Sequence, residues 1–271
     1  MKAPAPAKIN LGLVVGPVRA DGKHELLTVY QRLALADRIQ IEPANRLTIA
    51  GFPGDTLVRD ALTALAARAG AASAWSVRIE KRLPVAAGLG SGSSDAATAL
   101  RLANETLPEP LSPAELHELA ATLGADVPFF LVDGPQLGSG DGTTLEPLDL
   151  PQDFWIVLVV PNDVQKPSTA AVYAAFDARD GGAGWDERRA ALLAALAAVR
   201  RPRDLAALPP NDLASSPLTD ELRGLGAFHA DVSGAGPAVY GLFHHRAPAE
   251  AAKRALKRVG ASWLTAPAWY G

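Results

Sequence analysis

Short apolar runs of strand length alternate along the chain with longer segments of helical spacing. In the first half, this pattern predicts strands at residues 9–15, 29–35, 38–42, 46–49 and 76–81, and helices at residues 56–69, 95–104 and 113–123. In the second half, it predicts strands at residues 155–160, 228–232, 238–243 and 262–265, and helices at residues 168–176, 186–199 and 248–259. The order of the second set is typical of the β-α-β-β-α-β arrangement of a ferredoxin-like lobe.

The change of pattern after Leu150 predicts an α+β chain with two domains, residues 1–150 and residues 151–271. A length of 271 residues is enough to bury a sizeable core and is near the size at which one core gives way to two. Hydrophobic residues make up 48% of the sequence and aromatic residues only 6%, so Ala, Leu and Val must supply most of the packing.

A segment rich in glycine and serine, PVAAGLGSGSSDAA, occupies residues 84–97 after a strand-like run. Its glycines lack a Cβ, so the backbone is free to adopt positive φ and to direct several N–H groups at one anion. The residues that follow favour a helix that begins at Ser93 or Ser94, with its positive end facing the loop. The segment predicts a phosphate-binding loop, but most such clusters seen alone are surface loops without a ligand.

Three further segments help to decide between a phosphate-binding loop and a surface loop without a ligand. APAKINL places Lys8 and Asn10 at alternate positions of a predicted strand, so their side chains share one face, although a lysine there is more often solvated than catalytic. LGADVPFF places Asp126 at the start of an apolar segment, where it equally fits the N-cap of a helical turn. VSGAGPAVYGLF, residues 232–243, joins two apolar strands by a turn whose glycines permit close approach to another loop or a ligand.

In this order, these segments resemble the motifs of the galactokinase, homoserine kinase, mevalonate kinase and phosphomevalonate kinase superfamily, the GHMP kinases, over nearly the whole chain. APAKINLGL, RADGKHELLTVYQ, LGADVPFFL and PSTAAVYAAFD are most similar to the family of 4-diphosphocytidyl-2-C-methyl-D-erythritol kinases. The resemblance implies an N-terminal lobe like domain 2 of ribosomal protein S5 and a ferredoxin-like C-terminal lobe. It also implies ATP-dependent phosphorylation of the 2-hydroxyl of the cytidyl substrate in non-mevalonate isoprenoid biosynthesis.

The resemblance further implies roles for individual residues. Asp126 becomes the general base for the attacking hydroxyl, and Lys8 favours its ionised form and stabilises developing charge. Asn10, Lys23 and His24 are expected to contact the substrate. ATP is expected to bring Mg²⁺ with it, without a stored metal site in the protein. The residues expected to contact ATP are Lys81, Pro84, Val85, Ala86, Ala87, Gly88, Leu89, Gly90, Ser91, Gly92, Ser93 and Ser94.

Some of these positions have an equally plain structural interpretation. Lys81 fits an exposed lysine at a strand end as well as a nucleotide contact. Thr169 in PSTAAVY and Asp212 in NDL also match family segments, but structural capping is favoured for both.

The sequence departs from the family pattern where the substrate is recognised. Lys23 replaces a tyrosine whose ring stacks on cytosine, and lysine has no π face to offer. His24 is retained and is able to hydrogen-bond the base edge. A cytosine site therefore needs another aromatic wall, for which Tyr30 and Trp155 are the candidates.

Three other positions differ from the family. Thr56 stands in place of an asparagine near the adenine, and Asp141 and Thr143 replace an arginine and a glutamate. These changes concern recognition, and they leave the phosphoryl-transfer residues in place.

Composition and charge argue against several kinds of partner and site. The net charge of −3 and the pI of about 6.0 argue against a nucleic-acid partner. The absence of cysteine excludes disulfides, thiolate nucleophiles and cysteine-ligated zinc. His244 and His245 point to opposite faces of a strand, so surface roles are favoured over metal binding. No signal peptide or membrane span is expected, which predicts a cytoplasmic protein without a membrane partner, either monomeric or a weak homodimer.

Two alternatives to the cytidyl kinase stay open on the sequence alone. The first is another GHMP kinase that phosphorylates a polyol, sugar or amino-alcohol, and Lys23 motivates it. The second is a non-catalytic nucleotide-binding relative, against which the presence of both Lys8 and Asp126 argues.

Overall fold

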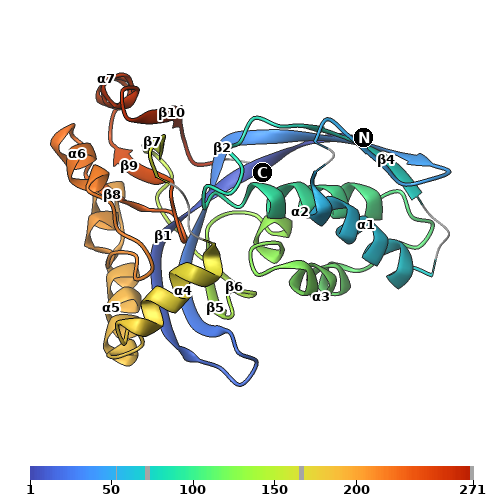
Figure 1. The fold of residues 1–271 in the computed structure, drawn as a ribbon, viewed down its shortest axis with the longest axis horizontal. Coiled ribbons are helices and arrows are strands. Elements are labelled where there is room, and N and C mark those ends of the chain that lie inside the picture. Colours follow the sequence, from blue (N-terminus) through green and yellow to red (C-terminus); the bar gives the residue numbers. More distant parts are fainter. Residues whose placement is uncertain (53, 71–73, 165–167, 269–271) are drawn as a thin grey trace.

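Two β-sheets, one from each half of the chain, organise the fold (Figure 1). The computed structural model describes residues 1–52, 54–70, 74–164 and 168–268. The strands of the first sheet are β1 Lys2–Val18, β2 His24–Ala44, β3 Thr48–Ala50, β4 Ala74–Glu80, β5 Gln136–Gly140 and β6 Thr144–Pro147. Those of the second sheet are β7 Trp155–Pro161, β8 His229–Val232, β9 Val239–Phe243 and β10 Gly260–Thr265.

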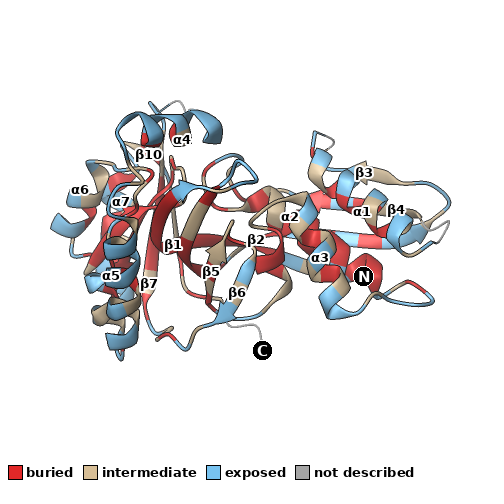
Figure 2. Cartoon of the chain, turned by 90° about the horizontal axis from the view of Figure 1, so that it is seen from below, coloured by how far each residue is buried: buried red, intermediate tan, exposed pale blue. Residues whose placement is uncertain are grey.

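Helices flank both sheets. The α-helices are α1 Thr56–Arg68, α2 Ser91–Asn104, α3 Pro113–Leu123, α4 Thr169–Ala178, α5 Trp185–Ala198, α6 Leu218–Gly224 and α7 Arg246–Leu256, and the short 3₁₀ helices are η1 Pro128–Leu131 and η2 Pro202–Ala207. In Figure 1, α1, α2 and α3 lie together along one side of the first sheet. Figure 2 shows that β1 and β2 run through the buried centre of the molecule, whereas α5 presents mostly exposed residues.

The antiparallel pair of β1 and β2 is the longest feature of the first sheet, with Lys2 opposite Gln40 at one end and Val18 opposite His24 at the other. The sequence predicted two strands, 29–35 and 38–42, and this division is wrong because β2 is continuous. Asp37, in the expected break, is buried within the strand, and its carboxylate accepts a hydrogen bond from the backbone N–H of Leu83 at 2.7 Å. A satisfied acceptor of this kind allows a charged residue to lie inside a strand.

The helices of the first half begin and end close to the predicted residues, with one instructive difference. The helix predicted over residues 113–123 is confirmed, and Ser112 and Glu115 form a capping box at its start. The predicted start of α2 at Ser93 or Ser94 is wrong, since α2 begins at Ser91 after Gly90. Gly90 takes the left-handed conformation (φ +67°), so a backbone turn, and not a serine side chain, starts the helix.

The second sheet has the strand order β10-β7-β9-β8, with every pair antiparallel. This is the ferredoxin-like arrangement that the sequence predicted for the C-terminal half. The helices η2 and α6 were not predicted, nor was the hairpin of β5 and β6. The hairpin sequence LGSGDGTT has the composition of a loop, and its pairing with β2 depends on tertiary contacts.

Strand β1 also contacts the second sheet and its helices. A Cβ on Gly12 would lie 2.9 Å from Leu192 of α5, and the Tyr240 hydroxyl of β9 donates to the Asn10 carbonyl at 2.9 Å. After β10 the chain returns to β2, where the Ala34 N–H donates to the Ala266 carbonyl at 2.8 Å. The two halves are thus joined along β1 and β2, and the boundary predicted after residue 150 stays a prediction.

Asp212 joins β1 to the C-terminal half. Its role is structural, but it is not the helix cap that the sequence favoured, because its carboxylate binds a strand and an arginine. Its carboxylate accepts hydrogen bonds from the Val15 backbone at 2.9 Å and from the Arg188 guanidinium at 3.0 Å.

We expect Asp212→Ala to lower the free energy of unfolding by about 1.5–3 kcal/mol, the usual loss for bonds to a charged group. Urea denaturation measures this loss, and kcat is expected to stay within about twofold because Asp212 lies outside the cavity described below. An unchanged unfolding midpoint would contradict the assignment.

Candidate active site

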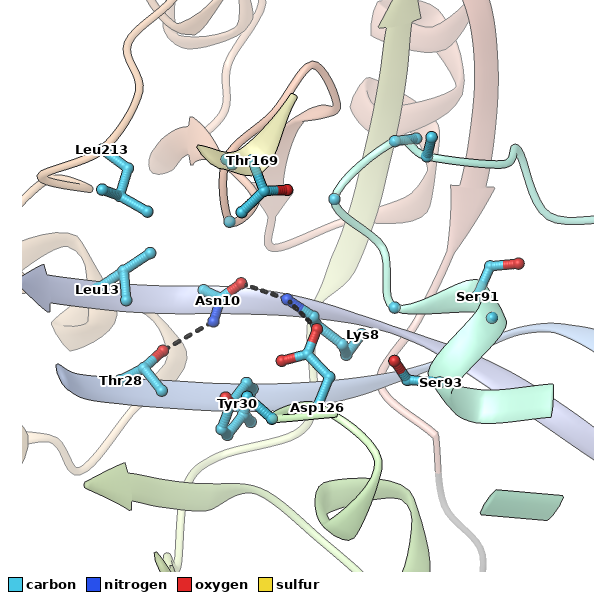
Figure 3. Close-up of a pocket in the computed structure, with 18 of the residues that line it drawn as sticks. Lys8, Asn10, Leu13, Thr28, Tyr30, Ser91, Ser93, Asp126, Thr169 and Leu213 are labelled. Carbon is cyan, nitrogen blue, oxygen red and sulfur yellow. Dashed lines mark hydrogen bonds and ion pairs between the residues drawn. The ribbon is translucent and has the colours of Figure 1, made fainter. Parts of the chain in front are cut away.

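A cavity of about 410 Å³ lies where β1, β2, the glycine-rich loop and α4 meet (Figure 3). Its lining includes residues from all four predicted motifs. These are Lys8 and Asn10 from β1, Gly88, Gly90, Ser91, Gly92 and Ser93 from the loop and α2, Ala125 and Asp126, and Gly234 and Ala235. Residues that are more than 200 positions apart in the chain therefore share one site.

Lys8 is the buried cation of this cavity, with only 3% of its surface exposed. Its ammonium donates to Asn10 Oδ1 at 2.7 Å and lies 3.3 Å from Asp126 Oδ2. The Asn10 amide in turn donates to Thr28 Oγ1 at 2.7 Å, as Figure 3 shows. The predicted shared face of Lys8 and Asn10 is confirmed, and Asn10 uses both ends of its amide to orient the lysine.

Asp126 lies just before η1, but it does not cap that helix. The N-cap residue is Val127, and no side chain makes a capping bond there. The Asp126 carboxylate is 30% exposed and pairs with Lys8. A carboxylate that is held on one side and open to a cavity on the other is suited to accept a proton from a bound ligand.

The loop before α2 is held against the C-terminal half. The Ser233 hydroxyl donates to the Gly88 carbonyl at 2.8 Å, and the Ala238 N–H donates to the Ala87 carbonyl at 3.0 Å. A Cβ on Gly88, whose φ is +83°, would lie 2.2 Å from the Ser233 carbonyl oxygen. The close approach expected of the 232–243 turn is therefore confirmed, and its partner is the glycine-rich loop.

The N-terminus of α2 faces the cavity. The first helical hydrogen bond runs from the Ser94 N–H to the Gly90 carbonyl at 2.8 Å, so the preceding N–H groups of the first turn have no acceptor within the helix. Gly92, expected at positive φ, instead lies inside this first turn. In Figure 3 the Ser93 hydroxyl points toward Lys8 and Asp126. Such a helix end, next to an ammonium group, is suited to bind a phosphate group.

Lys81 lies beneath the loop rather than at an exposed strand end. Its ammonium is 2.8 Å from Asp37 and 2.6 Å from Asp95, and it also donates to the Ser91 hydroxyl. Both carboxylates are fully buried. These contacts engage the three donors of the ammonium, so Lys81 acts on the position of the loop through Ser91.

Lys23 and His24 do not line the cavity as the structure describes it. The Lys23 ammonium is 57% exposed and forms an ion pair with Asp141 at 2.6 Å. Burial raises the pKa of Asp141, but hydrogen bonds from Lys23 and Thr143 outweigh this effect and bring the pKa to about 2. Lys23 thus links the β1–β2 turn to the β5–β6 turn.

The ring of His24 is buried, and both of its nitrogens face oxygen atoms. Nδ1 lies 2.9 Å from the Gly16 carbonyl, and Nε2 lies 3.3 Å from Asp177. The ring stacks on Tyr173 with 5.0 Å between centroids, and Tyr173 itself lines the cavity. His24 therefore packs against the ring of Tyr173.

The aromatic residues of the cavity are Tyr30 and Tyr173. Trp155, the other expected wall, instead lies at the start of β7, with its ring centroid 5.3 Å from the Arg246 guanidinium. Tyr173 was missed as a candidate, although a signal was present. Thr169 and Tyr173 are four residues apart in a predicted helix and so share a face, and both line the cavity.

Comparisons with known proteins agree with this fold and site. The model for the GHMP kinases N-terminal domain matches residues 56–134, and the model for the GHMP kinases C-terminal domain matches residues 190–262. Together with the two-sheet fold, the helix end and the Lys8–Asp126 pair, these matches define an ATP-dependent small-molecule kinase of the GHMP class.

Similar proteins narrow the class to one family. The 4-diphosphocytidyl-2-C-methyl-D-erythritol kinase of Anaeromyxobacter dehalogenans is 41% identical over 93% of this chain and 84% of its own length. That of Deinococcus radiodurans is 40% identical over 97% and 91%. A crystal structure of 4-(cytidine 5'-diphospho)-2C-methyl-D-erythritol kinase, 34% identical, aligns over 99% of this chain and all of the other with a TM-score of 0.80. The chain belongs to the 4-diphosphocytidyl-2-C-methyl-D-erythritol kinase family.

Within residues 1–52, 54–70, 74–164 and 168–268, no group of three or more His, Asp or Glu residues is arranged to hold a metal ion. In the same residues, no helix has both the length and the apolar character that a membrane span requires.

The buried Asp95 beneath the loop predicts a pH dependence. Burial raises its pKa from 3.8 to about 7, against the opposing effect of the Lys81 ammonium. Because the folded pKa exceeds the unfolded one, the folded protein binds more protons between these values, and stability falls as pH rises from about 4 to about 7. Asp95→Asn removes this titration. As pH rises from about 4 to about 7, we expect the Tm of the variant to increase relative to that of the parent protein. Curves of Tm against pH that stay parallel for the two proteins would contradict the assignment.

Proposed function

We propose that this chain transfers the γ-phosphoryl group of ATP to the 2-hydroxyl of 4-diphosphocytidyl-2-C-methyl-D-erythritol, a step of non-mevalonate isoprenoid biosynthesis. The observation that carries the proposal is the Lys8–Asp126 pair, which lies in one cavity with the N-terminus of α2 and with Tyr173. The family of the chain supports the identity of the acceptor.

Asp126 acts as the general base in this proposal. The substrate hydroxyl loses its proton to the Asp126 carboxylate as its oxygen attacks the γ-phosphorus. The bond from that phosphorus to the oxygen bridging it to the β-phosphate breaks, and ADP leaves with the electron pair. Lys8 stabilises the negative charge that develops on the attacking oxygen and on the phosphoryl oxygens.

The loop and the first turn of α2 hold the phosphates of ATP. The free N–H groups of the first turn, the Ser91 and Ser93 hydroxyls and the helix dipole together favour a polyanion. Lys81 contributes by holding Ser91 in place. This donor set suits a nucleotide that arrives with Mg²⁺, because magnesium at such sites keeps several waters and needs few protein carboxylates. When bound, Mg²⁺ would neutralise charge on the phosphates, and Asp126 and Ser93 would offer it side-chain oxygens.

Tyr173 supplies the aromatic wall for the cytosine in place of the tyrosine that Lys23 replaces. Tyr173 lines the cavity, and its ring stacks on His24. A base stacked on an aromatic side chain gains about 1–3 kcal/mol. The ion pair of Lys23 with Asp141 leaves Lys23 with a structural role at the rim of the site.

The acceptor is tested by ATP turnover with the cytidyl substrate beside mevalonate, homoserine and galactose. We expect turnover on the cytidyl substrate alone, with the new phosphate on the tertiary 2-hydroxyl by phosphorus NMR. Turnover on another acceptor, and none on the cytidyl substrate, would move the protein to a different branch of the GHMP kinases. If none of the four acceptors led to formation of ADP, a different function altogether would be favoured.

The role of Asp126 gives a second prediction. Asp126→Asn keeps the shape of the side chain but removes its basicity, so we expect kcat to fall by at least about 100-fold. The affinity for ATP, measured by calorimetry, is expected to change by less than about threefold. Normal turnover of the variant would contradict the assignment of the base.

The role of Tyr173 separates recognition from chemistry. Tyr173→Ala is expected to raise KM for the cytidyl substrate by about 10- to 100-fold, because the stacking surface is lost. The KM for ATP is expected to stay within about twofold. Tyr173→Phe is the matched control, since it keeps the ring, and its KM should be close to that of the parent protein. Equal KM values for the Ala and Phe variants would rule out stacking at this position.

A further inference from the structure

Tyr30 of β2 is a buried residue of the active-site cavity to which the proposed mechanism gives no role. It is only 2% exposed, and it lines the cavity next to Asp126 (Figure 3). Burial raises its pKa well above the usual range, and the negative charge of the nearby Asp126 carboxylate raises it further. The phenol therefore stays protonated at any working pH and acts toward Asp126 only as a donor.

The ring of Tyr30 is fixed by its neighbours. It stacks on Phe129 with 4.8 Å between centroids and 25° between planes, and Phe129 lies three residues after Asp126. On another side, the β5–β6 hairpin closes over the ring. A Cβ on Gly138 would lie 2.6 Å from Tyr30 Cε2, and a Cβ on Gly142 would lie 2.9 Å from the Tyr30 hydroxyl. The hairpin thus has glycine at the two positions where a side chain would push the phenol away.

Asp126 needs such a partner. Lys8 contacts one carboxylate oxygen, Oδ2, at 3.3 Å. Rotation of a carboxylate about its terminal bond is only weakly restricted, so one contact does not fix the plane of the group. A donor from a second direction does fix it, and Tyr30 comes from β2 whereas Lys8 comes from β1.

We propose that Tyr30 is a positioning residue for catalysis: its hydroxyl donates to the Asp126 carboxylate and holds it in the orientation that accepts the proton of the substrate. The inference rests on the proposed role of Asp126 as the general base. Tyr30 takes no proton and acts only through Asp126. Its effect is on geometry, where a displacement of about 1 Å can change a rate by about 100-fold.

The first test is Tyr30→Phe, which removes the hydroxyl and keeps the stack on Phe129. We expect kcat to fall by about tenfold, because Asp126 loses one of its two supports. The KM values for ATP and for the cytidyl substrate are expected to stay within about twofold. Unchanged kcat, or a change confined to KM, would overturn the proposal.

Tyr240→Phe is the matched control for loss of a buried phenol oxygen. Tyr240 is fully buried, lies outside the cavity lining, and donates to the backbone carbonyl of Asn10. Its removal is expected to lower Tm while kcat stays within about twofold. If Tyr240→Phe lowered kcat as much as Tyr30→Phe does, the effect would be a general one of packing, and the proposal would fail.

A double-mutant cycle with Asp126→Asn decides whether Tyr30 acts through Asp126. Single-turnover rates with radiolabelled ATP, followed for hours, measure the slow variants. We expect Tyr30→Phe to change the rate of Asp126→Asn by less than about twofold, because the group that it positions is already lost. A further tenfold fall would show an independent role for Tyr30 and overturn the inference. Normal turnover of Asp126→Asn by itself would instead overturn the proposed base.

Discussion

The burial of Lys8 on β1 is the constraint on which the rest of the site depends. An ammonium group with 3% exposure is stable only if charged or polar partners surround it. Asn10 supplies one partner from the same strand, and the register of β1 with β2 supports Asn10 through Thr28. Asp126 must then come from a distant segment to complete the set, which fixes the position of the chain between α3 and η1.

The same strand brings the glycine-rich loop and the C-terminal half to this point. The Lys8 backbone N–H donates to the Leu89 carbonyl at 3.0 Å, and a Cβ on Gly234 would lie 3.5 Å from the Lys8 ammonium. The loop is therefore held between β1 on one side and the turn after β8 on the other. A phosphate bound at α2 consequently lies close to both members of the Lys8–Asp126 pair. Proximity of this kind, more than any single group, accounts for the rates of phosphoryl transfer.

Local patterns in the sequence predicted much of the fold and the central part of the site. The spacing of Lys8 and Asn10, the glycine-rich loop and the helix over residues 113–123 are short-range signals, and each has its expected position. The β5–β6 hairpin could not be predicted, because its glycines fit the ring of Tyr30, which is far away in the sequence. The partners of Lys81 and the contribution of Tyr173 also depend on long-range packing that no local pattern contains.

The most direct test of this mechanism is the stereochemistry of transfer from ATP made chiral at its γ-phosphorus with oxygen isotopes. A base that deprotonates the acceptor leads to one in-line displacement, because the attacking and leaving oxygens lie on opposite sides of the phosphorus. The account therefore predicts inversion of configuration at phosphorus in the product. Retention would mean two displacements through a phosphorylated side chain, and it would contradict the role of Asp126 as a base beside Lys8.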